Sequence, residues 1–224
     1  MKRNYDETET FEYMYQYKNE PDEEFIKRQR LTKLEETYRN PLIYSVGNEL
    51  HFSSGINKVT IEYAIRLITE IIHNNKNDYK KYKEGDKKLE ITYIVDSPGG
   101  CVSSILKFAD FVKMVNIKHP YVEFISIITG TAASAGTIMS TIAHKRLMTS
   151  HANAMIHELS SGMSGSYTKL ASYGNHLKQL HNDLADIYMK KCKVKRKRIL
   201  KLLKNETWLN ATEYLNLGLI DEII

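Results

Sequence analysis

The sequence is poor in cysteine. Only Cys101 and Cys192 occur among its 224 residues. Two cysteines are too few for a disulfide scaffold, and their spacing matches no zinc site. We expect a protein of a reducing compartment, most simply the cytoplasm. Cys101 is expected to be a small buried residue and not a nucleophile.

Targeting and membrane-spanning patterns are also missing. Residues 1–16 become acidic at once and have no apolar stretch typical of a secretory signal. Residues 124–143 carry no Asp, Glu, Lys or Arg over nearly the length of a bilayer span. Their middle, TGTAASAGT, is however small and hydroxylated, whereas a spanning helix is mostly Leu, Ile, Val or Phe. This composition predicts a buried strand followed by a buried helix.

The overall composition is that of a globular protein. Hydrophobic residues make up 42% of the chain and charged residues 26%, which excludes a wholly disordered protein. The formal net charge is +5, but residues 190–204 hold nine basic residues and no acidic one, so the remainder has a net charge of −4. The basic character is therefore local. A nucleic-acid-binding surface on this run stays an alternative to a solvated helix face.

The chain divides into an N-terminal extension, residues 1–47, and one α/β domain, residues 48–224. The extension is predicted to hold a charged tail and a helix near residues 22–38. In the domain, hydrophobic periodicity predicts a strand, tight turn, helix and second strand, which together form a parallel βαβ unit. The predicted elements are a helix at 59–72, a strand at 89–97 with its turn to 100, a helix at 101–115, strands at 122–130, 145–148 and 154–156, and a helix at 166–191.

The last of these helices is unusually long. At 1.5 Å per residue it would extend about 39 Å, which is more than a compact domain of this size easily covers. Its apolar residues step by three and four and form one stripe. The stripe predicts contact with a partner subunit, although packing on the chain's own sheet stays an alternative. Its members are Leu170, Tyr173, Leu177, Leu180, Leu184 and Ile187.

Three segments carry residue types suited to acyl-transfer chemistry. Ser134 is flanked only by Gly and Ala, as at a strand-to-helix turn that admits a substrate close to the backbone. His157 ends a short apolar strand and can accept a serine proton from a neighbouring turn. In DSPGG, residues 96–100, Pro and two Gly permit a turn whose N–H groups face a ligand. Each segment taken alone also fits a purely structural role: a packing contact, a core histidine or a plain turn.

Taken together, the segments resemble the proteolytic subunit of the Clp protease, the ClpP-type serine peptidases of family S14. The similarity rests on the ordered set DSPGG, GTAASAGT, MIHELSSG and ETWLNATEYLNLGLIDEII, and it covers the chain from about Asn48 to the C-terminus. It implies an α/β fold of the ClpP/crotonase type, a spiral of βαβ units with a protruding handle helix. The ETW form of the last motif looks like the phage and prophage branch of the family.

The resemblance also implies roles for individual residues. Ser134 falls on the nucleophile, His157 on the general base, and the N–H groups of Gly100 and Ala135 on the oxyanion hole. The family's third triad member is an Asp, and the matching position here is Glu206, whose longer carboxylate can still orient the imidazole. The scheme needs no metal and no cofactor.

Assembly and partners follow from the same resemblance. ClpP-like subunits form stacked heptameric rings through the handle and receive unfolded protein from a Clp-type AAA+ ATPase, which alone uses ATP. Lys204 and Asn205 stand where the family has an Asp-Arg pair that couples the two rings, so the residues of that switch are absent. The basic run at 190–204 lies in the region of ring contacts and bears first on assembly.

Other functions remain open at this point. One is a catalytically silent ClpP-like ring subunit, and another is a phage-type maturation protease with a narrow protein substrate. A crotonase-type acyl-CoA enzyme shares the spiral fold but has no need of a serine, a histidine and a carboxylate together. Neither a membrane partner nor nucleic acid is expected.

Overall fold

A mostly parallel sheet runs through the folded domain of this computed structural model, which describes residues 42–76 and 87–224. The helix predicted near residues 22–38 lies outside the described residues. In the main path of the sheet, only the first two strands pair in antiparallel fashion. The order along that path is β1 (Ile43–Val46), β2 (Glu49–Phe52), β3 (Leu89–Ser97), β4 (Val122–Ala133), β5 (Lys145–Met148) and β8 (Glu222–Ile223).

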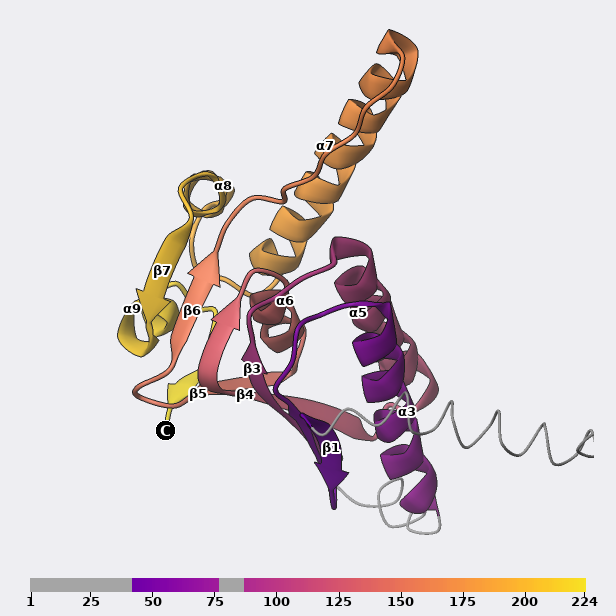
Figure 1. The fold of residues 1–224 in the computed structure, drawn as a ribbon. Coiled ribbons are helices and arrows are strands. Elements are labelled where there is room, and N and C mark those ends of the chain that lie inside the picture. The colour runs from indigo at the N-terminus through magenta and orange to yellow at the C-terminus, as the bar shows by residue number, and fades with distance from the viewer. Residues whose placement is uncertain (1–41, 77–86) are drawn as a thin grey trace, which may run out of the picture. The chain divides into compact units, whose positions relative to one another are not determined.

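The sheet divides along its longest strand, β4. Residues 125–128 of β4 pair with β5, whereas residues 131–133 pair with β6 (Asn153–Ile156). β6 in turn pairs in antiparallel fashion with β7 (Thr207–Asn210). The carboxyl end of β4 therefore leaves the main sheet and enters a second layer, as a spiral of βαβ units requires (Figure 1).

Six described helices accompany the strands. α3 (Lys58–Asn74) begins with a capping box, in which the Asn57 side chain accepts from the Thr60 N–H and the Thr60 hydroxyl accepts from the Asn57 N–H. α3 and α5 (Val102–Lys118) lie side by side and cover one side of the sheet (Figure 1). The others are α6 (Ala135–Thr141), α7 (Tyr167–Met189), α8 (Arg196–Lys204) and α9 (Ala211–Asn216).

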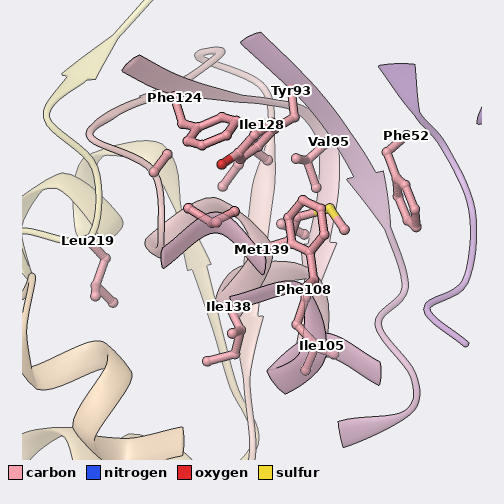
Figure 2. Close-up of a cluster of buried hydrophobic side chains, with 14 of the residues drawn as sticks. Phe52, Tyr93, Val95, Ile105, Phe108, Phe124, Ile128, Ile138, Met139 and Leu219 are labelled. Carbon is pink, nitrogen blue, oxygen red and sulfur yellow. The ribbon is translucent and has the colours of Figure 1, made fainter. Parts of the chain in front are cut away.

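The core lies between this sheet and its helices. Alternate residues of β3 are buried, and Tyr93 packs edge-on against Phe108 of α5, with 5.7 Å between ring centroids and 71° between planes. Phe124 of β4 lies against the other side of Tyr93 (Figure 2). Ile138 and Met139 of the short helix α6 join the same core. α6, which begins directly after Ser134, is thus fixed by hydrophobic packing.

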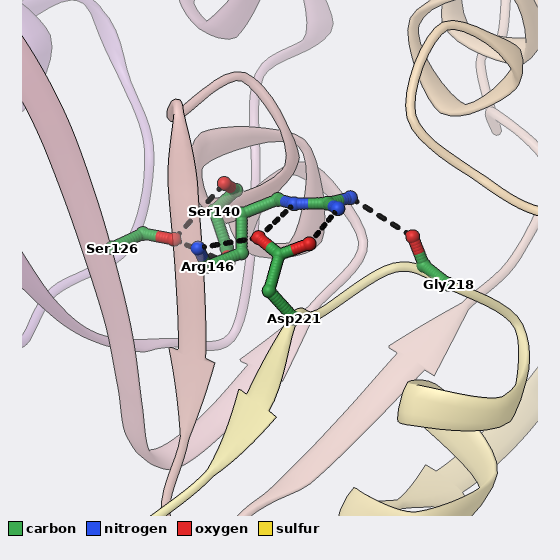
Figure 3. Close-up of polar contacts among 5 residues, drawn as sticks. All are labelled: Ser126, Ser140, Arg146, Gly218 and Asp221. Atoms are coloured by element: carbon green, nitrogen blue, oxygen red, sulfur yellow. Dashed lines mark hydrogen bonds and ion pairs between the residues drawn. The ribbon is translucent and has the colours of Figure 1, made fainter.

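An ion pair between a buried arginine and a partly exposed aspartate ties the C-terminal end of the chain to the sheet. Arg146 of β5, 5% exposed, donates from Nε and Nη2 to the two carboxylate oxygens of Asp221 at 3.0 and 2.5 Å, and from Nη1 to the Gly218 carbonyl at 3.0 Å (Figure 3). Burial by itself raises the pKa of Asp221, but hydrogen bonds from Arg146 and its charge outweigh burial, and the pKa lies below its ordinary value. These paired hydrogen bonds between Arg146 and Asp221 hold β8 beside β5.

The sequence predictions of the main elements are confirmed. The βαβ unit is β3, α5 and β4, and the strand predicted at 145–148 has the bounds of β5. The boundary predicted at 47/48 falls in the two-residue turn between β1 and β2, so β1 belongs to the sheet although it precedes that boundary. The pair Gly47-Asn48 is the sequence signal that could have predicted this hairpin. Gly47 has φ +57°, a conformation that tight hairpin turns require.

The long helix α7 is buried only near its C-terminal end. Leu184, Ala185 and Tyr188 are buried, whereas Leu170 is 42% exposed. Figure 1 shows α7 extending away from the sheet and the other helices of the domain. Packing against α6 and α8 of the same chain therefore accounts for the end of the predicted stripe but not for its beginning. No helix among the described residues combines the length and apolar character needed to cross a bilayer.

Candidate active site

Ser134 occupies a sharp turn between β4 and α6. Its backbone has φ 53° and ψ −119°, a conformation that costs a non-glycine residue about 1–3 kcal/mol. The turn is held on both sides: the Ser134 N–H donates to the Met155 carbonyl at 2.8 Å, and the Ser134 carbonyl accepts from the Thr137 N–H at 3.0 Å. Such strain at the end of a strand presents a side chain outward from the sheet, as a nucleophile requires.

The turn after β3 packs directly against this serine. Gly99 has φ +90°, and a Cβ built there would lie 2.5 Å from the Ala133 carbonyl oxygen and 2.8 Å from the Ser134 Cβ. Gly100 has φ +145°, and its Cβ would lie 2.1 Å from the Ile56 carbonyl oxygen. Only glycine fits at either position, which explains the pair of glycines in the DSPGG motif.

The two predicted oxyanion donors are backbone N–H groups near Ser134. The Ile56 N–H donates to the Gly99 carbonyl and the Cys101 N–H to the Ile56 carbonyl, both at 2.8 Å. The Gly100 N–H takes no part in this bridge. Ala135 is the first residue of α6, so its N–H has no acceptor within the helix. Since the Gly99 Cβ position is only 3.1 Å from the Ala135 nitrogen, the structure brings these two segments together.

His157 is placed by the strand that pairs with the end of β4. Ala133 is opposite Met155 in the parallel register, so His157 follows just beyond the point where Ser134 leaves β4. The imidazole is half-buried. In the antiparallel ladder of β6 and β7, Ile156 is opposite Thr207. The next facing positions are therefore His157 and Glu206.

Glu206 lies in the turn between α8 and β7. The residue is exposed and has φ 43°. Among the described residues, no hydrogen bond links His157 to Ser134 or to Glu206. Catalytic hydrogen bonds are commonly long in a free enzyme and shorten in the substrate complex. Strand pairing thus places Ser134, His157 and Glu206 directly after or before the paired ends of β4, β6 and β7, and the close packing of Gly99 places the DSPGG turn beside Ser134 and Ala135.

Cys101 differs from its prediction as a buried residue. It is exposed at the start of α5. The Ser103 hydroxyl, 3.2 Å from Sγ, and the side chain and backbone of Ser104 stabilise the thiolate and lower the pKa of Cys101 to about 7. The prediction of burial was wrong because Cys101 is the N-cap residue of α5, just before the part of the helix that packs in the core.

Two polar residues at the end of β3 support the site but received no role from the sequence. Asp96 Oδ1 accepts from the Thr131 N–H at 2.9 Å and thereby joins the DSPGG turn to the last part of β4. Ser97 Oγ donates to the Ser54 carbonyl at 2.7 Å and accepts from the Gly99 N–H at 3.2 Å. The available signal was a pair of polar side chains at a strand end immediately before Pro-Gly-Gly.

The site is built from side chains and backbone amides of the protein. In the ranges 42–76 and 87–224, no three His, Cys, Asp or Glu side chains gather as metal ligands would.

Comparison with known proteins gives matches that agree with the resemblance found in the sequence. A family model described as Clp protease matches residues 57–224.

Individual relatives agree with the family match. The chain is 33% identical over 143 residues to the "ATP-dependent Clp protease proteolytic subunit 1" of Protochlamydia amoebophila (strain UWE25), which covers 62% of this chain and 67% of the relative. It is 30% identical over 138 residues to the protein of the same name from Chlamydia trachomatis serovar D, covering 60% of this chain and 69% of the relative. Because the family match extends from the start of α3 to the C-terminus, the chain belongs to the Clp protease family and is a serine-type peptidase.

Proposed function

We propose that this peptidase cleaves unfolded polypeptides by acyl transfer through Ser134, His157 and Glu206. The observation that carries the proposal is the position of Ser134. It sits in a strained turn that contacts the Gly99-Gly100 segment on one side and the strand leading to His157 on the other. A nucleophile, a base and two backbone donors within one such arrangement are the parts that a serine peptidase needs.

In the proposed reaction, Ser134 Oγ attacks the carbonyl carbon of a peptide bond while His157 takes the hydroxyl proton. The N–H groups of Gly100 and Ala135 donate to the tetrahedral oxyanion, an interaction worth several kcal/mol. The C–N bond then breaks, and His157 gives its proton to the departing amine. Water attacks the acyl-enzyme with His157 again as base, which releases the new carboxyl end and restores the serine.

Glu206 has a supporting role in this scheme. Its carboxylate would hold the imidazole in the tautomer that can accept the serine proton, and would stabilise the imidazolium that forms. The register of β6 and β7 supports this role because positions 157 and 206 both directly adjoin its last pair, Ile156 with Thr207. No metal takes part, and ATP is consumed only by a partner ATPase.

We further propose that the subunits assemble through α7 into stacked heptameric rings that work with a Clp-type AAA+ ATPase in the cytoplasm. The exposed N-terminal part of α7 supports the assembly, since apolar residues such as Leu170 stay uncovered in the single chain. The relatives are named as subunits of an ATP-dependent protease, which supports the ATPase partner.

Hydrolysis of a fluorescently labelled unfolded protein, such as casein, tests the proposal. We expect the wild-type oligomer to cleave it, with added ATPase where required. Ser134→Ala should abolish cleavage, and Ser150→Ala, which removes an exposed hydroxyl between β5 and β6, should leave it unchanged. A well-folded oligomer that cleaves neither casein nor a short fluorogenic peptide would indicate a catalytically silent subunit. Cleavage that persists in Ser134→Ala would reject the assigned nucleophile.

A further inference from the structure

A buried chain of hydrogen bonds runs from the base of α7 to the turn that carries Ser134. The Tyr188 hydroxyl lies 2.5 Å from Thr137 Oγ1, and Thr137 Oγ1 lies 2.5 Å from the Ser134 carbonyl oxygen. Tyr188 is 2% exposed and Thr137 is fully buried. The chain therefore joins two segments 51 residues apart through polar groups that solvent does not reach.

The direction of these hydrogen bonds follows from the number of protons. A threonine hydroxyl has a single proton, and the carbonyl of Ser134 can only accept. The Thr137 hydroxyl therefore donates to Ser134, which leaves its lone pairs to accept from Tyr188. Burial raises the pKa of Tyr188, so the phenol keeps the proton that this arrangement needs.

The Ser134 carbonyl matters because of the group at the other end of its peptide bond. The peptide unit is planar, so the orientation of the Ser134 carbonyl fixes the direction of the Ala135 N–H. That N–H is one of the two proposed oxyanion donors. Ser134 is also in a positive-φ conformation that persists only where the surroundings hold it. A hydroxyl that anchors the carbonyl thereby aims the N–H.

We propose that Tyr188 and Thr137 are positioning residues that lock the Ser134–Ala135 peptide in the orientation required for oxyanion stabilisation. Neither side chain contacts the substrate in this account. The inference rests on the proposed function, since it assigns a purpose to the peptide bond beside the proposed nucleophile. The inference assigns a function to the hydrogen bonds that connect α7 to the turn at Ser134.

Tyr188→Phe tests the proposal, because it removes the hydroxyl and keeps the ring. With a fluorogenic peptide as substrate, we expect kcat to fall about tenfold or more, less than the hundredfold to thousandfold loss when a whole oxyanion donor is removed. KM should stay unchanged, since the peptide-binding surface is not altered. The rate of Ser134 labelling by an alkyl fluorophosphonate should fall in parallel with kcat.

Tyr93→Phe is the matched control. Tyr93 is a second fully buried tyrosine, and its hydroxyl has no hydrogen-bond partner among the described residues. Its removal should change neither kcat nor the labelling rate. Thr137→Val should reproduce the defect of Tyr188→Phe, and Thr137→Ser, which keeps a hydroxyl, should restore most of the activity. The effects of Tyr188→Phe and Thr137→Val should not add in the double variant, because both break one chain.

The outcomes separate the two proposals. If wild-type protein is labelled at Ser134 but Tyr188→Phe and Thr137→Val react at the wild-type rate, the positioning role is overturned and the proposed function stands. If wild-type protein is not labelled at all, the proposed function fails and the inference fails with it. Should Tyr188→Phe not fold, the comparison of Thr137→Val with Thr137→Ser decides: equal kcat values for the two overturn the positioning role.

Discussion

His157 and Glu206 are the first facing positions beyond the end of the β6–β7 ladder, whose last pair is Ile156 with Thr207. Glu206 has φ 43° and lies in the turn before β7, so the ladder ends at Thr207, but both residues directly adjoin its last pair. The register that pairs β6 with β7 therefore brings position 206 to the same end of the ladder as His157.

Glu206→Gln should lower kcat by about a hundredfold to ten-thousandfold, because the neutral amide can neither fix the required tautomer nor stabilise the imidazolium. Glu206→Asp should retain most of the activity. The control is Glu158→Gln, an exposed carboxylate directly after His157, which should stay within about twofold of wild type. Peptide hydrolysis measured for the three variants checks this, and inactivation by Glu158→Gln alone would reassign the third catalytic residue.

Gly99→Ala should abolish peptide hydrolysis and destabilise the fold. The added methyl group would meet Ser134 Cβ at 2.8 Å at a residue with φ +90°, and the combined strain amounts to about 2–4 kcal/mol. Gly174→Ala is the control, since nothing lies within 4 Å of its Cβ position on α7 and alanine is the better helix former. Urea unfolding monitored by circular dichroism measures the stability of both variants, and peptide hydrolysis measures their activity. A Gly99→Ala protein with wild-type stability and activity would contradict the close packing described for this turn.

Alkylation of Cys101 should report its lowered pKa. In a Cys192→Ser background, the rate of reaction with iodoacetamide should rise with pH and reach half of its maximum near pH 7, because only the thiolate reacts. Ser103→Ala should move that midpoint upward, toward the ordinary value of 9.0, because the largest stabilising hydrogen bond is lost. A midpoint that is unaffected by Ser103→Ala would contradict this cause.

The Arg146–Asp221 pair should make stability depend on acid pH. The pKa of Asp221 is lower in the folded than in the unfolded chain, so the pair stabilises the fold above the ordinary pKa of 3.8 and this stabilisation disappears as pH falls through the lower, folded value. Asp221→Asn should cost about 2–4 kcal/mol near pH 7, less than a fully buried pair because the Asp221 side chain is 39% exposed.

Urea titrations at a series of pH values test this dependence. The difference in free energy of unfolding between wild type and Asp221→Asn should be constant from neutral pH to about pH 5 and should shrink below pH 3.8. Glu222→Gln is the control, since its ion pair with Lys145 is exposed on both sides and contributes little. A difference that grows toward acid pH would contradict the assigned sign.

The parts of the fold that sequence could predict are those set by local pattern. Alternation along 89–97 and helical spacing along 59–72 predicted β3 and α3 because burial of one face has a fixed period. The division of β4 between β5 and β6 was not predictable in this way. Residues 125–128 are mostly Ile and residues 131–133 are Thr and Ala, but this local difference does not say which distant strand each part of β4 pairs with.

The candidate site, too, could be predicted only where a local sequence pattern sets it. Ser134, His157 and Glu206 were predicted from motifs and their order, but one contact that holds the site comes from Tyr188, a residue outside every motif. The Thr137–Tyr188 hydrogen bond joins positions 51 residues apart, and neither residue type is unusual in a helix. Such contacts depend on how α6 and α7 pack, which local periodicity does not encode.

The central claim, that Ser134 is the nucleophile of this peptidase, is tested most directly by locating the adduct of an alkyl fluorophosphonate. Mass spectrometry of the digested wild-type oligomer should find one phosphonylated residue, Ser134, with the adduct absent in Ser134→Ala and strongly reduced in His157→Ala. An active, labelled protein whose adduct lies on any other serine, or an active protein that the reagent neither labels nor inhibits, would contradict the account.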